Sequence, residues 1–384
     1  MNKIMISIAM LVMAIITASC SGNGNKKEAA SVDTDSVVEV KTQYAKGFTV
    51  RMLDDGTRLV DVKDPQKSKG MTYRFALVCH GAKATDIPEG YTRIEVPIKR
   101  TILMTMLQLS NFTILNAHDV VKGITGTKNL YDKDILERVK KGEIVKIGVE
   151  GNFDPELVMA AAPDVIFISP FKRGGYDAIK ETGVTLVPHL GYKELDPLGQ
   201  AEWIKFVAMF IGKEKEANEI FRGIADRYNE LKSKVEVVGG ERPTIFSGEM
   251  HGGNWHAVGG KNYLAQIFRD AGADYVINDD NTGGIPIEFE AMYAKAANAD
   301  YWRILNSFPG EFSYEALQKS EPRNAMFKAF RDKKVIYCNM KTTPYYEISP
   351  VMPDKVLADF VAIFHPQVMP EGYTPTFYKL LKGR

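Results

Sequence analysis

The sequence predicts an α/β fold in which two lobes, each built on a parallel β-sheet, are joined by a single long helix. Residues 213–236 place apolar side chains at spacings of three and four, which is typical of one amphipathic helix. At about 1.5 Å per residue this helix would run roughly 35 Å. On both sides of it, short apolar runs alternate with helical patterns, and this rhythm favours parallel sheets covered by helices. A long helix that caps one domain is the alternative interpretation.

The first residues have the pattern of a secretory leader. Lys3 precedes an apolar run over residues 4–18, and small residues then end in Cys20. A cysteine directly after the cleavage point is similar to a bacterial lipoprotein signal, in which the thiol is acylated. We therefore expect a signal peptide at 1–19, lipidation of Cys20 and a flexible tether at 20–44. An uncleaved anchor is the minor alternative, because a membrane span needs about 20 apolar residues.

The first lobe is expected over residues 45–197. It opens with a small antiparallel unit, in which Asp54, Asp55 and Gly56 indicate a tight hairpin turn. The alternating pattern follows. The predicted strands lie at 48–52, 57–62, 73–78, 93–96, 120–125, 165–169 and 184–187, and the predicted helices at 101–109, 154–162 and 176–182.

Linker helices, including the long one, are expected over residues 198–238, and the second lobe over 239–384. Gly212 ends a helix at 198–211, directly before the long helix. A helix, an aspartate and a strand follow Glu156 in the first lobe, and the same order follows Glu290 in the second. The predicted strands of the second lobe lie at 244–246, 275–277, 301–305 and 335–338, and its helices at 263–271, 290–297 and 353–364.

Composition and motifs exclude several classes of protein. The net charge of +1 argues against a nucleic-acid partner, because neutralising phosphates needs a basic surplus. The sequence has no P-loop, no G-x-S-x-G and no H-E-x-x-H, so we expect no enzyme and no cofactor. Without a CxxC pair or clustered histidines, no structural metal site is expected. Cys79 and Cys338 are consistent with either a disulfide or two free thiols.

Taken together, the chain resembles the periplasmic substrate-binding proteins of ABC importers for metal chelates, a family whose members bind ferric siderophores, haem or cobalamin. The similarity spans about residues 48–381. It is carried by VVKGI at 120–124, FDPELVMAAAPDVIFIS at 153–169, IGKE at 211–214, residues 255–260 and 270–272, and the tail at 357–359 and 364–366.

The resemblance implies a ligand cleft between the lobes and one exposed glutamate per lobe that docks on arginines of an inner-membrane permease. By position these are Glu156 and Glu290. Their place in the first turn of a helix suits the role, although acidic residues there also simply favour the helix dipole. We expect a monomer held to the membrane by its lipid anchor. Ser21 after the cysteine favours the outer membrane.

Ligand contacts are expected in the loops that follow the strands, because ligands lie beyond the carboxyl ends of open parallel sheets. Cations there would suit a chelate with residual negative charge, and aromatic or histidine side chains would suit a flat macrocycle or iron. Solvated loop residues and core packing are the alternatives. The candidates are Arg100, Lys172 and Arg173, with Lys99, Lys128 and Tyr131, in the first lobe, and His251, Trp255, His256, Tyr345 and Tyr346, with Met250, in the second.

The predicted function is therefore that of a lipid-anchored binding component of an ABC importer for an iron chelate, siderophore or haem, or for cobalamin. Two rival hypotheses follow from the same residues. One is a chelatase-like enzyme that acts on a metal-porphyrin. The other is a surface lipoprotein that captures haem or a siderophore and passes it to an outer-membrane receptor.

Overall fold

The structure is a computed structural model that describes residues 40–84, 86–149, 152–170 and 176–383. The predicted signal peptide, Cys20 and the tether up to residue 39 lie outside the described residues, as do Lys172 and Arg173. In the described part, no helix has both the length and the apolar character that crossing a membrane requires.

A four-stranded sheet opens the described chain. β1 (Phe48–Met52) and β2 (Arg58–Lys63) form the predicted antiparallel hairpin, and β3 (Thr72–Cys79) continues it. β4 (Thr92–Val96) runs parallel to β3 and belongs to the same sheet. It was expected to begin the alternating region, which instead begins at the next strand.

The first lobe contains a five-stranded, fully parallel sheet in the order β11-β10-β5-β6-β7. Helices follow its strands as the alternating pattern predicts, and a short ribbon of two strands, β8 and β9, precedes α3. The strands are β5 (Thr101–Leu103), β6 (Val121–Ile124), β7 (Val145–Lys146), β8 (Gly148–Val149), β9 (Asn152–Phe153), β10 (Val165–Ile168) and β11 (Thr185–Pro188), and the helices are α1 (Met106–Ile114), α2 (Lys133–Lys140), α3 (Pro155–Ala161) and α4 (Tyr176–Lys180).

The predicted helix at 101–109 is wrong at its start. Residues 101–103 form β5, the central strand of this sheet, and all three side chains are buried. A strand covered on both faces has no alternation of polar and apolar residues, so its sequence resembles part of a buried helix. The helix begins only at Met106, where Thr105 and Gln108 form a capping box.

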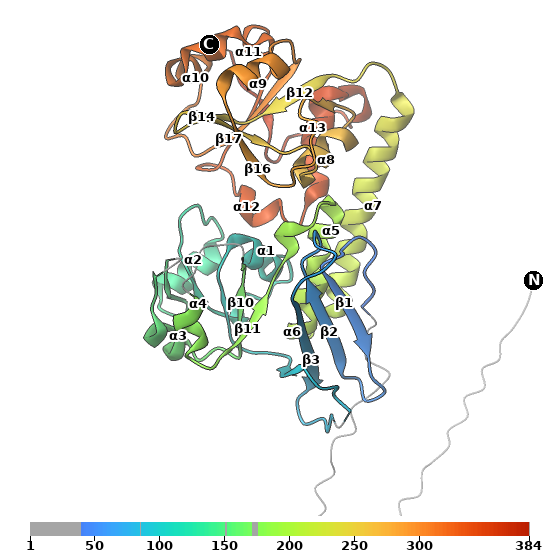
Figure 1. Cartoon of the computed structure of the whole chain (residues 1–384), viewed down its shortest axis with the longest axis vertical. Coiled ribbons are helices and arrows are strands. Elements are labelled where there is room, and N and C mark those ends of the chain that lie inside the picture. Colours follow the sequence, from blue (N-terminus) through green and yellow to red (C-terminus); the bar gives the residue numbers. More distant parts are fainter. Residues whose placement is uncertain (1–39, 85, 150–151, 171–175, 384) are drawn as a thin grey trace, which may run out of the picture. The chain divides into compact units, whose positions relative to one another are not determined.

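The long helix is confirmed as α7 (Glu214–Val238), 25 residues in length. It packs against α6 (Trp203–Ile211), which follows α5 (Pro197–Ala201), and against α13 (Pro353–Phe364) of the second lobe (Figure 1). Lys213 at its start donates to the Leu115 carbonyl of the first lobe at 2.6 Å. Tyr228 donates to Asp270 of the second lobe at 2.8 Å. Because α7 is bonded to both lobes, the alternative of a helix that caps one domain is wrong.

The second lobe repeats the architecture of the first. Its five-stranded sheet has the order β15-β12-β17-β18-β19, parallel except for the last strand, and a three-stranded sheet, β13-β14-β16, lies beside it. The strands are β12 (Thr244–Ser247), β13 (Glu249–His251), β14 (Asn254–Val258), β15 (Asp274–Tyr275), β16 (Gly284–Ile287), β17 (Tyr301–Asn306), β18 (Val335–Asn339) and β19 (Lys379–Leu380), and the helices are α8 (Tyr263–Asp270), α9 (Phe289–Ala296), α10 (Tyr314–Ser320), α11 (Lys328–Arg331) and α12 (Tyr345–Ile348).

Asp164 and Asp300 occupy equivalent positions in the two lobes. Each aspartate lies between a helix and a strand. Asp164 accepts the backbone N–H groups of Lys99 and Arg100 at 2.7 and 2.9 Å, just before β5. Asp300 accepts the backbone N–H of Thr244 at 2.9 Å, at the start of β12. Both carboxylates therefore bind the amino end of the neighbouring strand. This shared role explains why the sequence has the same order of helix, aspartate and strand in both lobes.

Replacing Asp300 with asparagine should lower the free energy of unfolding by about 1–2 kcal/mol at neutral pH, because it removes a charge-assisted bond to Lys328 at 2.7 Å. Partial burial acts to raise the pKa of Asp300, but hydrogen bonds from Lys328 and Thr244 outweigh it and lower the pKa to about 2. A lowered carboxyl pKa gives stability that is present above the unfolded value near 3.8 and is lost as the pH falls toward 2. Urea unfolding of both proteins should therefore show a difference that shrinks over this range; a difference independent of pH would contradict the assignment.

The two cysteines of the described chain are free thiols. Cys79 lies on β3 and Cys338 is buried on β18. Burial raises the pKa of the Cys338 thiol to about 12, so it stays protonated and unreactive at neutral pH. Of the two alternatives that the sequence allowed, the structure has the pair of free thiols.

Candidate functional site

The first lobe has a hollow of about 310 Å³ at the carboxyl ends of β5 and β6. The loops that leave these two strands supply most of its wall, and the ribbon before α3 and the start of α4 supply the rest. The hollow is lined by Met104, Thr105, Met106, Thr125, Gly126, Lys128, Val149, Phe153 and Tyr176.

The lining is mostly apolar and polarizable, and among its described residues Lys128 carries the one charge. Met104 and Met106 offer polarizable thioethers, and the rings of Phe153 and Tyr176 stack with centroids 5.9 Å apart. Lys128 is the cation of the lining, and its side chain is exposed and forms no ion pair with any described residue. Such a surface suits a flat apolar group that carries a negative charge at its edge.

The loop that supplies Lys128 also joins the two lobes. At its other end, the backbone N–H groups of Tyr131 and Asp132 donate to the carboxylate of Glu347 on α12, the second of them at 3.0 Å. The Tyr131 hydroxyl donates to the Met340 carbonyl at 2.6 Å. We call these four residues the lobe clasp. Lys128 and Tyr131 follow β6, as the sequence predicted, and their contact with a ligand stays a prediction.

Glu347 is buried in the clasp, with 8% of its surface exposed. Burial raises the pKa of its carboxyl group, and the N–H bonds from Tyr131 and Asp132 act in the opposite direction. None of the described lysines, arginines or histidines forms an ion pair with it. The carboxylate therefore depends on the backbone of the first lobe for its hydrogen bonds.

The β13-β14 hairpin of the second lobe carries four of the predicted contacts, and of these only the two histidines are exposed. Trp255 is fully buried among Phe246, Trp302 and other rings, and its Nε1 donates to the Ser247 carbonyl. The expectation that Trp255 faces the cleft is wrong, because β14 turns this side chain into the core. His251 and His256 are exposed, with their rings 6.0 Å apart, and Met250, directly before His251, is half-buried.

Tyr345 and Tyr346 differ in exposure. Both were placed in a loop, but they open α12, and their rings lie edge to face with centroids 5.3 Å apart. Tyr345 is buried against Phe377 and Tyr378, whereas 49% of Tyr346 is exposed. Tyr346 is therefore the one of the two that a ligand can reach without rearrangement.

Arg100 lies at the opposite end of the sheet from the hollow. Its guanidinium donates to the carbonyls of Ala161 and Ala162 at 2.6 to 3.0 Å, where α3 ends, and its backbone binds Asp164. The prediction placed it after a strand of the parallel sheet, but β4 belongs to another sheet and Arg100 precedes β5. A role in closing the end of α3 accounts for this arginine.

The described residues contain no cluster of three or more histidine, cysteine or acidic side chains arranged to hold a metal ion.

Residues 106–342 match the family model described as periplasmic binding protein. That span begins at α1 and includes most of the residues that line the hollow, α7 and most of the second lobe. The chain belongs to the periplasmic binding protein family. Its fold is typical of the binding proteins that serve ABC importers, and its family and structural neighbours bind solutes and are not enzymes.

One relative of this periplasmic binding protein matches nearly its whole length. An uncharacterized lipoprotein of Methanocaldococcus jannaschii is 26% identical over 417 residues, which cover 98% of this chain and 96% of the relative. The family and this relative support a place in the cell envelope, and they do not favour the outer membrane.

Two solved structures show the fold and the range of solutes it serves. A periplasmic haem-binding protein from Pseudomonas aeruginosa matches with a TM-score of 0.58 and 18% identity, over 75% of this chain and 99% of that one. The molybdate-binding protein MolA of Haemophilus influenzae matches with a TM-score of 0.53 and 16% identity, over 71% and 87%. At such identities the comparison establishes the fold alone, and the ligand has to be inferred from the residues of the site.

The two predicted docking glutamates of this binding protein lie in the first turns of α3 and α9. Glu156 is exposed, and Asp154 caps the helix by accepting its backbone N–H at 2.9 Å. Glu290 is 76% exposed and binds Arg323 at 2.9 Å. Two exposed methionines lie nearby in the sequence. Met159 on α3 follows Glu156, and Met326 follows Arg323, the ion-pair partner of Glu290.

Sequence reasoning missed Met104, Met106, Phe153 and Tyr176 as lining residues. The first two were assigned to a helix that starts too early, and the others were not considered. These four residues could have been predicted from their positions. Each lies close to the end of a strand or the start of a helix, at the same edge of the sheet as Lys128.

Proposed function

We propose that this chain is the lipid-anchored substrate-binding component of an ABC importer and that it captures a metal chelate: haem, an iron siderophore or cobalamin. The observation that carries the proposal is the hollow of the first lobe. It combines apolar and aromatic walls with a cation, Lys128, that no described residue pairs, at the edge where open parallel sheets hold ligands. A carboxylate or other anionic group of the chelate would pair with this lysine.

The second lobe is proposed to complete the site. A volume of about 310 Å³ lies at the lower end of the range for pockets that enclose a drug-sized ligand, so a chelate would also touch the facing lobe. His251, His256 and Tyr346 remain candidate contacts because their side chains are exposed on the second lobe. A small doubly charged oxyanion such as molybdate fits less well, since thioethers and aromatic carbons cannot replace its lost hydration.

Delivery is proposed to use Glu156 and Glu290 as docking carboxylates for arginines of the permease. Lipidation at Cys20, which lies outside the described residues, would keep the protein at the membrane. Two acyl chains give stable anchoring where one gives only marginal binding. The relatives do not favour the outer membrane, so we propose a location in the cell envelope and assign it to neither membrane.

Replacing Lys128 with methionine should weaken haemin binding about tenfold, because it removes a charge-assisted bond from a partly exposed site while keeping the length of the side chain. Absorbance and calorimetric titrations with haemin, a ferric siderophore, cobalamin and molybdate would measure this. Lys140→Met on the exposed side of α2 is the matched control and should bind as the wild type does.

The same titrations test the function itself. If the wild-type chain binds none of the three chelates, the proposal is wrong. If it binds molybdate alone, the ligand class is wrong and the binding-protein fold serves an oxyanion. Formation of a metal-porphyrin from free metal and porphyrin would instead revive the enzyme hypothesis.

A further inference from the structure

The loop between β6 and α2, residues 125–132, contacts the hollow at one end and the second lobe at the other. Thr125, Gly126 and Lys128 line the hollow. Tyr131 and Asp132, only three and four positions beyond Lys128, form the lobe clasp with Glu347 and Met340. A segment this short cannot change its position at one end without changing the contacts at the other.

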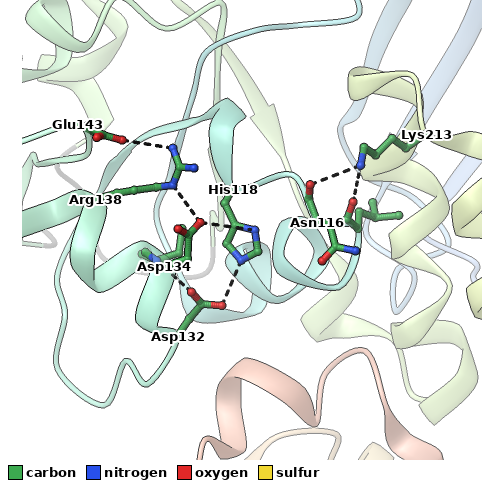
Figure 2. A network of polar contacts seen from close by, with 9 residues as sticks. Asn116, His118, Asp132, Asp134, Arg138, Glu143 and Lys213 are labelled. Atoms are coloured by element: carbon green, nitrogen blue, oxygen red, sulfur yellow. Dashed lines mark hydrogen bonds and ion pairs between the residues drawn. The ribbon is translucent and has the colours of Figure 1, made fainter. Parts of the chain in front are cut away.

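The far end of this loop is firmly held within the first lobe. Asp132 is the N-cap of α2 and accepts the Ile135 N–H at 2.9 Å, and its other oxygen lies 3.2 Å from His118 Nε2. Figure 2 shows His118 between Asp132 and Asp134, with the chain of contacts continuing through Arg138 to Glu143. These bonds anchor the side chain of Asp132, so the peptide groups that carry the Tyr131 and Asp132 N–H can still shift together with residues 125–131.

Glu347 makes the clasp sensitive to small displacements. Its buried carboxylate is bonded to two backbone N–H groups at the positive end of α2, and no described cation pairs with it. A shift of about 1 Å in the loop would break bonds of this length and leave the charge unsatisfied. The clasp thus has two distinct arrangements, one with both hydrogen bonds to Glu347 formed and one with them broken, and intermediate arrangements are unfavourable.

We propose that residues 125–132 transmit ligand occupancy from the hollow to the second lobe, with Glu347 as the positioning residue that receives it. This rests on the proposed function, because it assumes that a chelate occupies the hollow. An anionic group that pairs with Lys128 holds the loop in the arrangement that binds Glu347, so loading favours the bonded clasp. The two docking glutamates lie on different lobes, and a permease that contacts both then senses loading through their relative position.

Hydrogen exchange of the Tyr131 and Asp132 amides, measured on the full chain with and without haemin, tests this proposal. We expect haemin to slow exchange at both amides in the wild type. In Glu347→Gln, which presents an amide in place of one acceptor oxygen, we expect exchange about tenfold faster without haemin and no slowing with it. Because coupling is reciprocal, the same variant should bind haemin about tenfold more weakly.

Three further variants separate coupling from a static brace. Tyr131→Phe removes only the bond to Met340 and should show the same changes in amide exchange and haemin affinity, but smaller ones. This variant keeps the test usable if Glu347→Gln folds poorly. Lys128→Met should weaken haemin binding but leave exchange of the ligand-free protein unchanged. Glu137→Gln, an exposed glutamate on α2 next to Lys141, is the control and should match the wild type.

The outcomes are distinct. Haemin binding of wild-type strength in Glu347→Gln, or haemin binding to the wild type without any change at Tyr131 and Asp132, would overturn the coupling and leave the proposed function intact. Absence of haemin binding by the wild-type chain would overturn the proposed ligand and the coupling with it.

Discussion

Charge reversal at both Glu156 and Glu290 should abolish uptake of the chelate while leaving its affinity for the purified protein unchanged. Each glutamate is exposed in the first turn of its helix and neither lines the hollow, so we expect neither to contribute to the ligand site. A lysine in place of either glutamate turns an attraction for a permease arginine into a repulsion, which costs several kcal/mol for juxtaposed charges. Reversing both charges together would therefore reduce uptake by more than about a hundredfold.

The two single variants should not be equivalent. Glu290 already binds Arg323, whose guanidinium is fixed by two bonds to Glu321 and lies 4.0 Å from the centroid of the Phe289 ring. A permease arginine must share Glu290 with this internal partner, whereas Glu156 forms no ion pair with any described residue. We therefore expect Glu156→Lys to reduce uptake more than Glu290→Lys.

Uptake of a radiolabelled chelate by cells that express the chain with its permease measures the effect, and titration of the purified variants measures affinity. Glu315→Lys, an exposed glutamate in the first turn of α10, reverses charge at a matched position and should leave uptake unchanged. Weakened ligand binding in the double variant would show that these residues belong to the site; uptake at the wild-type rate would exclude them from docking.

The sequence predicted those parts of the fold that depend on local pattern. The apolar stripe from Ala217 to Val235 made α7 recognisable, because a helix packed on one face keeps its period. Glu156 was placed correctly in a first turn because Asp154 and Pro155 mark the start of α3, and Glu290 because the same order of helix, aspartate and strand follows it. Lys128 and Tyr131 were placed at the right edge of the sheet once β6 was recognised, since parallel strands share their carboxyl edge.

What the sequence could not predict depends on tertiary contacts. The segment from Thr101 to Met106 has no alternation of polar and apolar residues, and only burial on both faces makes its first part a strand. Gly252 and Gly253 near Trp255 suggested an open loop, but their positive φ angles close a tight hairpin that turns the tryptophan inward. Glu347 joins Tyr131 across 216 positions, and no local pattern marks such a partner.

Acid should destabilise the first lobe through His189, and this is the second large effect that we expect. His189 follows β11, is fully buried, and lies against Trp203 with ring centroids 4.7 Å apart. Its Nδ1 has no hydrogen-bond partner among the described residues, and its Nε2 lies 3.5 Å from Asn111 Nδ2. No described carboxylate compensates a charge there, and burial lowers the pKa of His189 from 6.5 to about 3.

A lowered histidine pKa means that between about pH 6.5 and 3 the unfolded chain binds a proton that the folded chain does not. The stability is therefore complete above pH 6.5 and falls as the pH falls, by up to about 1.4 kcal/mol per pH unit, or about 2 kcal/mol at pH 5. His189→Phe keeps a ring against Trp203 and removes the proton site, so its free energy of unfolding should decline less steeply. Urea unfolding of both proteins from pH 7.5 to 4.5 measures the two slopes, and any fixed cost of fitting phenylalanine shifts the curve without changing its slope. Parallel slopes would mean that His189 is protonated in the folded protein and that the lobe opens to solvent at this position.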